Sequence, residues 1–363
     1  MLKLRRGSVV SDDPLTVEVA GERRRAWADP ALVGPVEIGD EVVVNTQALD
    51  LELGSGGFDV VHVNLTRGLE YGGAAGDAHV MKLNYSSLQH AVEPIEADEP
   101  ASRERLIPMP PMPAPPVLVI PLHGHLAPAV WAARQANPGI NVGFVQGAGG
   151  ALPGSLSRDV TDLRDRGLVA GHVTAGAAYG AQAEAITVPG GIDAAVHELA
   201  WDAAVVGPGP GILGSDSRLG HGGMAALDAA HSAMALGLPT LVCPRLSSSD
   251  PRPRHRGLSH HSSTVLSMLL GPVRVPVPEA AVEGWPLLDE DAPEGGSPQA
   301  ALDELIEICG GRHDIAVQPI DLDGYAASGL PTTTMGRSIS EDPLFFAAPL
   351  AAGRALAEHG GRE

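Results

Sequence analysis

The densest group of chemically reactive side chains lies in one polar stretch, DPRPRHRGLSHHSST, at residues 250–264. Three histidines there, His255, His260 and His261, accompany the carboxylate of Asp250. Imidazole nitrogens and carboxylate oxygens are ligands that zinc, manganese and iron ions accept in proteins. We therefore expect these four residues to hold a divalent metal (Zn, Mn or Fe) and to act as the catalytic residues by activating a water molecule on it.

The same stretch concentrates positive charge, because Arg245 precedes it and it contains Arg252, Arg254 and Arg256. Guanidinium groups gathered in one loop repel one another unless an anion or a carboxylate lies among them. Guanidinium forks bind phosphate or carboxylate oxygens through paired hydrogen bonds. We expect Arg252, Arg254 and Arg256 to bind an anionic group of the ligand. The alternative is an ion-pair network with the acidic body of the protein.

A glycine-rich segment, GPGPGILGSDSRLGHGG at residues 207–223, follows an apolar run and precedes a predicted helix. Glycines allow backbone N–H groups to turn toward a phosphate, and a helix N-terminus favours negative charge. We expect Gly209, Gly211, Gly214 and Ser215 to contact the ligand. The alternative is that a tight strand-to-helix turn needs glycine whatever the ligand.

Two further polar loops are predicted at the same edge of the fold. His123 and His125 follow an apolar run, and Thr333 and Arg337 lie in LPTTTMGRS near the C-terminus. We expect all four to contact the ligand, and a histidine of HGH could share the metal with the second histidine cluster. The alternative is that HGH makes only local hydrogen bonds at a helix start. Cys243 is interpreted as a buried core thiol rather than a nucleophile.

Strand-like and helix-like segments alternate along residues 117–363, and this alternation predicts a doubly wound, Rossmann-like, mostly parallel sheet covered by helices. Apolar runs predict strands at residues 117–120, 141–145, 172–174, 185–188, 203–206, 240–243 and 315–317. Apolar periodicity predicts helices near 127–136, 157–166, 192–199 and 224–236, one from residue 297 that buries Leu302, Leu305, Ile306 and Cys309, and a short C-terminal helix. The polar loops then lie at the carboxyl ends of parallel strands, where open α/β sheets bind ligands.

Residues 1–66 contain short β-branched runs separated by glycine turns, which predicts a small antiparallel β domain, either a barrel or a half-barrel. Only Trp27 and Phe58 could provide stacking platforms in it, so we favour a structural or dimerising role over oligonucleotide binding. Residues 67–116 are predicted to form a connector, with a strand at 81–85 and the proline-rich linker PMPPMPAPP. Residues 117–363 then form the α/β domain.

The chain of 363 residues carries a formal net charge of −20, which argues against nucleic acid and anionic membrane as partners. Its two cysteines form neither a disulfide framework nor a repeated metal-ligand pattern. The N-terminus lacks the apolar segment of a signal peptide, and no apolar run reaches the ~18 residues that a membrane span needs. We expect a cytoplasmic protein that binds a small anionic molecule, with a homodimer as a possible assembly.

Two local motifs resemble known enzyme families. HRGLSHHS at residues 255–262 is similar to the HRG-x-[ST]-H-S motif of predicted membrane-bound metal-dependent hydrolases. HGHLAPAVWAARQ at 123–135 and HGGMAALDAAHSAMALGLPTLVCP at 221–244 resemble the acceptor and donor motifs of two-domain glycosyltransferases, with Asp228 near the place of the family's acidic residue. Too few residues separate Gly124 from Gly222 to complete one Rossmann domain and most of another.

A longer resemblance covers nearly the whole chain. The segments GDEVVVNTQALDLELGSGG, LPGSLSRDV, GPGPGILGSDSRLGHGG and RLSSSDPRPRHRGLSHHS are similar to those of an uncharacterised bacterial family, domain of unknown function 3866. This resemblance implies one architecture across both parts of the chain and no established activity.

These observations favour a metal-assisted hydrolase or transferase that acts on a phosphorylated or carboxylated small molecule at the carboxyl edge of the sheet. Two alternatives are a non-catalytic nucleotide- or anion-binding module and a glycosyltransferase-like enzyme that uses a sugar nucleotide.

Overall fold

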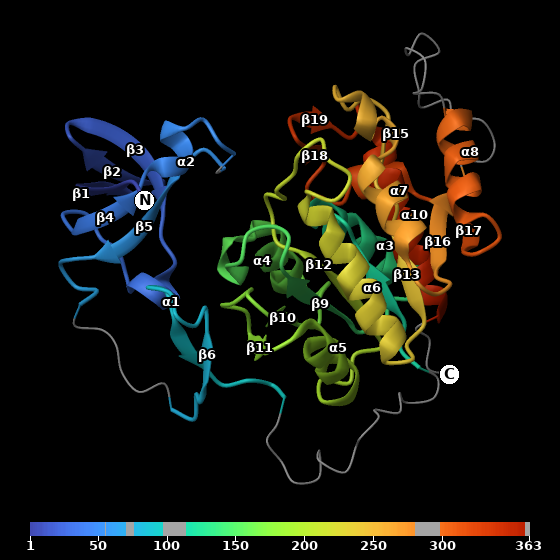
Figure 1. Cartoon of the computed structure of the whole chain (residues 1–363), viewed down its shortest axis with the longest axis horizontal. Helices are drawn as coiled ribbons and strands as arrows, with labels where there is room; N and C mark the ends of the chain where they lie inside the picture. The colour runs from blue at the N-terminus through green and yellow to red at the C-terminus, as the bar shows by residue number, and fades with distance from the viewer. Residues whose placement is uncertain (55, 70–75, 97–113, 280–297, 360–363) are drawn as a thin grey trace. The chain divides into compact units, whose positions relative to one another are not determined.

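The computed structural model describes residues 1–54, 56–69, 76–96, 114–279 and 298–359, with residues 298–302 described by their backbone alone (Figure 1). The chain divides into two compact units, residues 1–93 and 94–363. The division falls inside the predicted connector of residues 67–116. Most of the proline-rich linker lies outside the described residues.

The first unit contains a closed five-stranded barrel with the strand order β1-β2-β3-β5-β4. Its strands are β1 (Leu4–Asp12), β2 (Leu15–Val19), β3 (Glu22–Trp27), β4 (Glu41–Asn45) and β5 (Asp59–Asn64), joined in part by the short helices α1 (Pro30–Val33) and α2 (Gln47–Asp50). Alternate valines such as Val42 and Val44 fill its interior, as expected for strands with one buried face. The prediction of an all-antiparallel domain is wrong in one respect, because β3 and β5 pair in parallel.

The predicted strand at 81–85 is shorter than expected. The observed strand, β6 (Val80–Lys82), pairs with β7 (His90–Val92) in an antiparallel hairpin. Leu83 and Tyr85 have positive φ angles of 48° and 60°, a conformation that breaks the extended backbone of a strand.

The second unit is built on an eight-stranded sheet in which every pairing is parallel, with the order β11-β10-β9-β12-β8-β13-β16-β17. The strands are β8 (Val117–Val119), β9 (Val142–Gly147), β10 (His172–Ala175), β11 (Ala183–Ala185), β12 (Ala203–Pro208), β13 (Thr240–Val242), β16 (Arg274–Pro278) and β17 (Asp314–Gln318). The predicted fold class is confirmed. Strand β16 was not predicted, and β11 ends before Thr187, which caps the next helix through its side chain.

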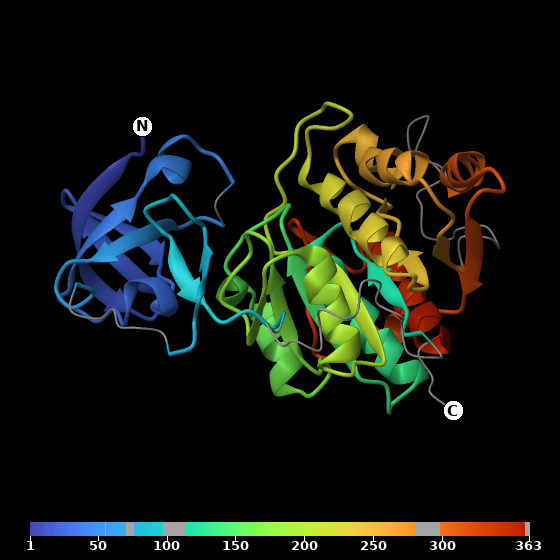
Figure 2. The ribbon, with the colours of Figure 1, turned by 60° about the horizontal axis from the view of Figure 1, so that its bottom comes forward.

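Helices cover both faces of this sheet (Figures 1 and 2). One layer contains α5 (Val188–His197), α6 (Ala225–Ala235), α7 (His260–Met268) and α8 (Pro298–Cys309), and the other contains α3 (Leu126–Ala136), α4 (Arg158–Asp165), α9 (Leu322–Ala326) and α10 (Pro343–His359). The C-terminal helix is longer than predicted, with 17 residues, and its apolar side chains are buried against α3. In α8 the structure buries Leu305 and Cys309 as expected, but it exposes Ile306.

The order of the strands brings four loops together. Strand β8 lies between β12 and β13, and Val119 pairs with Val206 on one side and with Val242 on the other. Along the chain β8 is followed by β9, which lies beyond β12 in the sheet, whereas β12 is followed by β13, which lies beyond β8 on the other side. The direction in which the chain adds strands therefore changes between β8 and β12. The loops after β8, β9, β12 and β13 leave the carboxyl edge of the sheet near this point. Ligands of open α/β sheets bind at such a point.

The structure also bears on two expectations about partners and relatives. Across the described residues, the helices are too short or too polar to cross a lipid bilayer. The two-domain architecture implied by the glycosyltransferase motifs differs from the barrel and single large sheet seen here.

Candidate functional site

A cavity of about 460 Å³ opens at the carboxyl edge of the sheet. Its wall is formed by the loops after β8, β12 and β13, the start of α4, and a small hairpin of β18 (Thr333–Thr334) and β19 (Arg337–Ser338). The hairpin occupies the segment that the sequence predicted as a polar loop. Residues from the Arg/His stretch and from the glycine-rich segment therefore face one space.

Three histidines lie together beside this cavity. One ring nitrogen from each of His221, His260 and His261 lies within 4.8 Å of the other two. The rings of His260 and His261 have centroids 4.4 Å apart. A divalent ion bound by three imidazoles keeps a position for water or substrate, as in catalytic zinc sites. We call these three residues the histidine triad.

Local backbone structure positions the triad. His260 and His261 begin α7, where the Ser259 side chain caps the helix by accepting from the His261 backbone N–H at 3.3 Å. The glycine-rich segment forms a turn closed by a hydrogen bond from the Gly222 N–H to the Leu213 carbonyl, at 2.7 Å, which places His221. A Cβ at Gly223 would lie 2.9 Å from His221 Nδ1, so only glycine leaves room for this ring.

The triad carries unsatisfied ring nitrogens. His221 Nε2 donates to the Arg218 carbonyl at 3.0 Å, so Nδ1 carries the lone pair, and Nδ1 is buried without a hydrogen-bond partner. Both ring nitrogens of His261 are also buried without partners. Buried polar atoms are almost always paired, so an unpaired group needs an explanation. A bound metal ion would supply one.

Burial lowers the pKa of each triad histidine and keeps the imidazoles neutral at neutral pH. The pKa of His261 falls to about 2, chiefly through burial and then through the neighbouring His221 and Arg245. For His260 burial also lowers the pKa, although the backbone of Arg254 opposes it. Neutral imidazole is the form that binds a metal.

His255 adjoins the triad but is held by another group. Its ring centroid lies 4.7 Å from that of His261, and its Nδ1 lies 2.7 Å from Ser259 Oγ. The ring lines the cavity, and burial lowers its pKa to about 3. His221, and not His255, completes the group of three histidines whose nitrogens could share a metal.

Asp250 does not join the histidines. It is fully buried and accepts hydrogen bonds from Arg245 at 3.0 Å and from Arg252 at 2.9 Å, with Arg337 at 3.5 Å. Its oxygens are thus engaged by guanidinium groups, and these hydrogen bonds hold the pKa of Asp250 below its usual range against the effect of burial. The structure thus places Asp250 among the arginines and outside the group of three histidines.

The predicted arginines differ in their surroundings. Arg252 and Arg254 line the cavity, and Arg254 pairs with Asp216 at 2.7 Å. Arg256 donates to the Asp250 carbonyl at 3.3 Å and does not line the cavity. The alternative prediction, that these arginines form ion pairs with acidic residues of the protein, therefore holds for part of the set.

Arg337 does not line the cavity. It pairs with Asp250 at 3.5 Å and with Asp342 at 3.0 Å. Its hairpin neighbours Thr333 and Thr334 do line the cavity.

The glycine-rich segment reaches the cavity through only part of its length. Gly211, Gly214 and Ser215 line it, and Gly211 has a φ of +73° that other residues rarely adopt. Gly209 does not line it. A Cβ there would lie 2.2 Å from the Ala151 carbonyl oxygen, so this glycine permits close packing of two loops.

The two histidines of HGH have separate roles. His123 lines the cavity, with Nε2 2.6 Å from Ser157 Oγ and Nδ1 3.1 Å from the Pro208 carbonyl. His125 is fully buried, 3.4 Å from Cys243 Sγ. Neither belongs to the triad. Cys243 is a buried thiol, as expected.

Comparison with known families gives a match that covers most of the chain. The model of the family described as Protein of unknown function (DUF3866) matches residues 25–353. The chain belongs to this family. The match to DUF3866 spans residues of both compact units, so the resemblance drawn from four sequence segments is confirmed. Searches of curated proteins and of solved structures found no match.

The sequence-based prediction for this DUF3866 member included neither His221 nor Arg245 among the site residues. His221 was visible in the HGG sequence that precedes a predicted helix, but it lies about forty residues before the other histidines. Arg245 was visible as a cation at a strand end, but its burial depends on the packing of α7 and the β18–β19 hairpin around it. Neither signal distinguishes a site residue without the fold.

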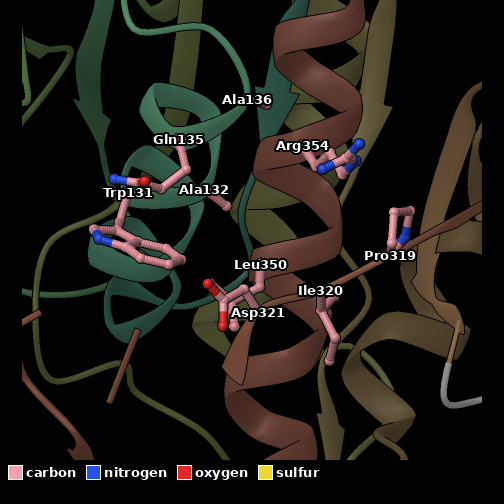
Figure 3. Close-up of a pocket in the computed structure, with 9 residues that line it drawn as sticks. All are labelled: Trp131, Ala132, Gln135, Ala136, Pro319, Ile320, Asp321, Leu350 and Arg354. Atoms are coloured by element: carbon pink, nitrogen blue, oxygen red, sulfur yellow. The ribbon is translucent and has the colours of Figure 1, made fainter. Parts of the chain in front are cut away.

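A second hollow, of about 200 Å³, lies between α3, α10 and the segment after β17 (Figure 3). Trp131 and Leu350 give it an apolar wall, and Gln135 and Arg354 lie at its edge. The Asp321 carboxylate in this wall caps α9 by accepting from the Gly324 N–H at 2.7 Å. This lining contains neither histidine nor cysteine, so the chemistry described above belongs to the larger cavity.

Proposed function

We propose that this protein is a metal-dependent hydrolase or transferase that acts on a phosphorylated or carboxylated small molecule in the 460 Å³ cavity. The observation that carries the proposal is the histidine triad, whose ring nitrogens lie within 4.8 Å of one another and include buried atoms without partners. A structural role would leave these atoms unsatisfied, whereas a metal ion satisfies one nitrogen of each ring.

The triad would hold a zinc, manganese or iron ion through three neutral imidazoles. The ion supplies a Lewis acid and lowers the pKa of a bound water molecule. His255 lines the cavity beside the triad, and burial keeps its imidazole neutral, so this ring would accept a hydrogen bond from that water. The Ser259 hydroxyl, 2.7 Å from Nδ1, fixes the orientation of this ring.

The remaining wall favours an anionic ligand. Arg245, Arg252 and Arg254 line the cavity, and Thr333 and Thr334 add hydroxyl groups from the β18–β19 hairpin. The turn at Gly211–Gly214 brings backbone to the same wall. Guanidinium groups and backbone amides are the usual partners of phosphate and carboxylate oxygens.

A second candidate is a nucleotide- or anion-binding module without turnover. The cavity lining favours it, because Arg252, Arg254 and the turn at Gly211–Gly214 offer guanidinium and backbone N–H groups that would bind an anion without a metal. In that case the arginines and the glycine-rich turn would bind the ligand and the triad would bind no metal.

An activity screen separates the two candidates. The protein is stripped with a chelator, reloaded with Zn²⁺, Mn²⁺ or Fe²⁺, and incubated with panels of phosphate monoesters and of carboxylate esters. The proposal predicts turnover that depends on the metal and is lost in His261→Gln. Thermal stabilisation by nucleotides or other anions, with no product from any reloaded protein, would favour the binding module.

A further inference from the structure

One guanidinium in the cavity wall is buried and incompletely paired. The Arg245 side chain is 2% exposed, and its Nη2 donates to Asp250 at 3.0 Å. Its Nε is buried without a hydrogen-bond partner, although the side chain lines the cavity. A buried guanidinium with an unused donor is costly unless another acceptor is bound.

The backbone of Arg245 is fixed to the start of α7, which carries two of the three triad histidines. Its N–H donates to Ser262 Oγ at 2.8 Å, and its carbonyl accepts from the Ser259 N–H at 2.9 Å. These two contacts flank His260 and His261 in sequence. Arg245 is therefore held beside the residues that would bind the metal.

The charges of the cavity balance before a metal is bound. Three guanidiniums, Arg245, Arg252 and Arg254, line it together with the carboxylate of Asp159. Two further carboxylates, Asp250 and Asp216, pair with these arginines. Arg337 also pairs with Asp250 and is balanced by Asp342, so four cations face four anions. A divalent ion on three neutral imidazoles adds two positive charges, which one dianion neutralises and a monocarboxylate does not.

We infer that the group bound beside the metal is a phosphoryl dianion held by Arg245, so the substrates are phosphate monoesters that react at this phosphoryl group. This inference rests on the proposed function and narrows its substrate class. Hydrolysis there breaks the ester O–P bond and forms a new O–P bond from water. One water proton passes to the alcohol that leaves, and the other stays on the phosphate.

The test uses inorganic phosphate as the probe and the full-length protein loaded with Co²⁺. The paramagnetic ion shortens the ³¹P relaxation time of phosphate that binds next to it. We expect strong, saturable relaxation in the wild-type protein, and binding of phosphate that is at least about ten times tighter than binding of acetate. Loss of one charged hydrogen-bonding partner in Arg245→Met should weaken phosphate binding by about ten- to a hundredfold with the cobalt retained.

Arg256→Met is the matched control, because Arg256 comes from the same loop and does not line the cavity. It should bind phosphate within about twofold of the wild type. Arg245→Met can fail to fold, since it leaves the buried Asp250 with fewer partners. If it does not fold, two measurements on the wild-type protein decide whether the inference holds: the ³¹P relaxation of bound phosphate and the affinity for phosphate compared with that for acetate.

The outcomes separate the inference from the proposed function. Cobalt that binds at the triad without relaxing phosphate, acetate that binds as tightly as phosphate, or a folded Arg245→Met protein with unchanged phosphate affinity would overturn the inference and leave a metal enzyme. A protein that binds no cobalt would overturn the proposed function itself, and the inference with it.

Discussion

The rings of His221 and His261 are stacked, with centroids 3.7 Å apart and planes inclined by 10°. The two residues come from the end of the glycine-rich turn and from the first turn of α7. Stacking at this distance disfavours a state in which both rings are charged, because two imidazolium ions would repel each other. The contact joins two motifs that are separate in the sequence, and both rings belong to the histidine triad.

The spacing of this contact depends on Gly223. A methyl group there would lie 2.9 Å from His221 Nδ1 and 3.3 Å from His261 Cβ, so Gly223→Ala must displace one ring. We expect metal affinity to fall by about tenfold or more while the fold is retained. Isothermal titration with Zn²⁺ measures this. Gly139→Ala is the control, since its methyl group would meet only Asn137 Oδ1 at 3.6 Å, and an equal loss in both variants would contradict the account.

Asp250 should matter for stability and not for metal binding. Asp250→Asn removes a fully buried charge from among Arg245, Arg252 and Arg337, so we expect the free energy of unfolding to fall by about 3 kcal/mol or more. Urea denaturation measures the loss. Asp314→Asn breaks an exposed pair with Arg274 and should cost less than about 1 kcal/mol. Loss of metal from a stable Asp250→Asn protein would restore Asp250 to the ligand set.

Buried neutral histidines should make the protein sensitive to mild acid. Burial lowers the pKa of His125 to about 3, whereas an unfolded chain protonates histidine near pH 6.5. Between these values the unfolded state binds more protons, so the free energy of unfolding falls as the pH drops below about 6.5, by up to about 1.4 kcal/mol per pH unit for such a histidine.

The comparison for this prediction is His125→Leu against the wild type, both in a chelator, by urea denaturation at several pH values. The variant should lose stability less steeply between pH 6.5 and 4, and the two pH profiles should run parallel above pH 7. The same slope in both proteins at acid pH would mean that His125 is not buried in its neutral form.

The cysteines should be unreactive in the folded protein. Both are buried, and burial raises the pKa of Cys243 well above its usual range and that of Cys309 to about 11. Thiolate is the reactive form, so iodoacetamide should label neither residue until the protein is unfolded. Mass spectrometry of labelled peptides reads this out. Rapid labelling of Cys243 in the native protein would return it to the list of candidate nucleophiles.

The fold could be predicted largely from local patterns. The apolar run at residues 117–120 and the helix near 224–236 appear in the structure, because burial on both faces of a strand and apolar periodicity in a helix leave clear signals. Strand β16 was missed because prolines at 276 and 278 interrupt its pattern. The parallel pairing of β3 with β5 depends on long-range contacts that no local pattern contains.

The candidate site could be predicted in its location but not in its membership. Polar loops at strand ends indicated the edge correctly, yet nearness in sequence suggested Asp250 as a partner of the histidines. In the structure Asp250 is hydrogen-bonded to arginine, and His221 joins the other histidines from another loop. Which polar residues share a site depends on the strand order, and that order is set by packing between distant segments.

The most direct test of the central claim is the metal content of the protein purified without a histidine tag, measured by elemental mass spectrometry beside His221→Ala and a His260→Ala/His261→Ala double variant. His231→Ala is the control, since His231 lies on α6 outside the triad. The account predicts close to one Zn, Mn or Fe per chain in the wild type and the control, and almost none in the triad variants. A wild-type protein that binds no metal even after incubation with these ions, yet unfolds cooperatively, would contradict it.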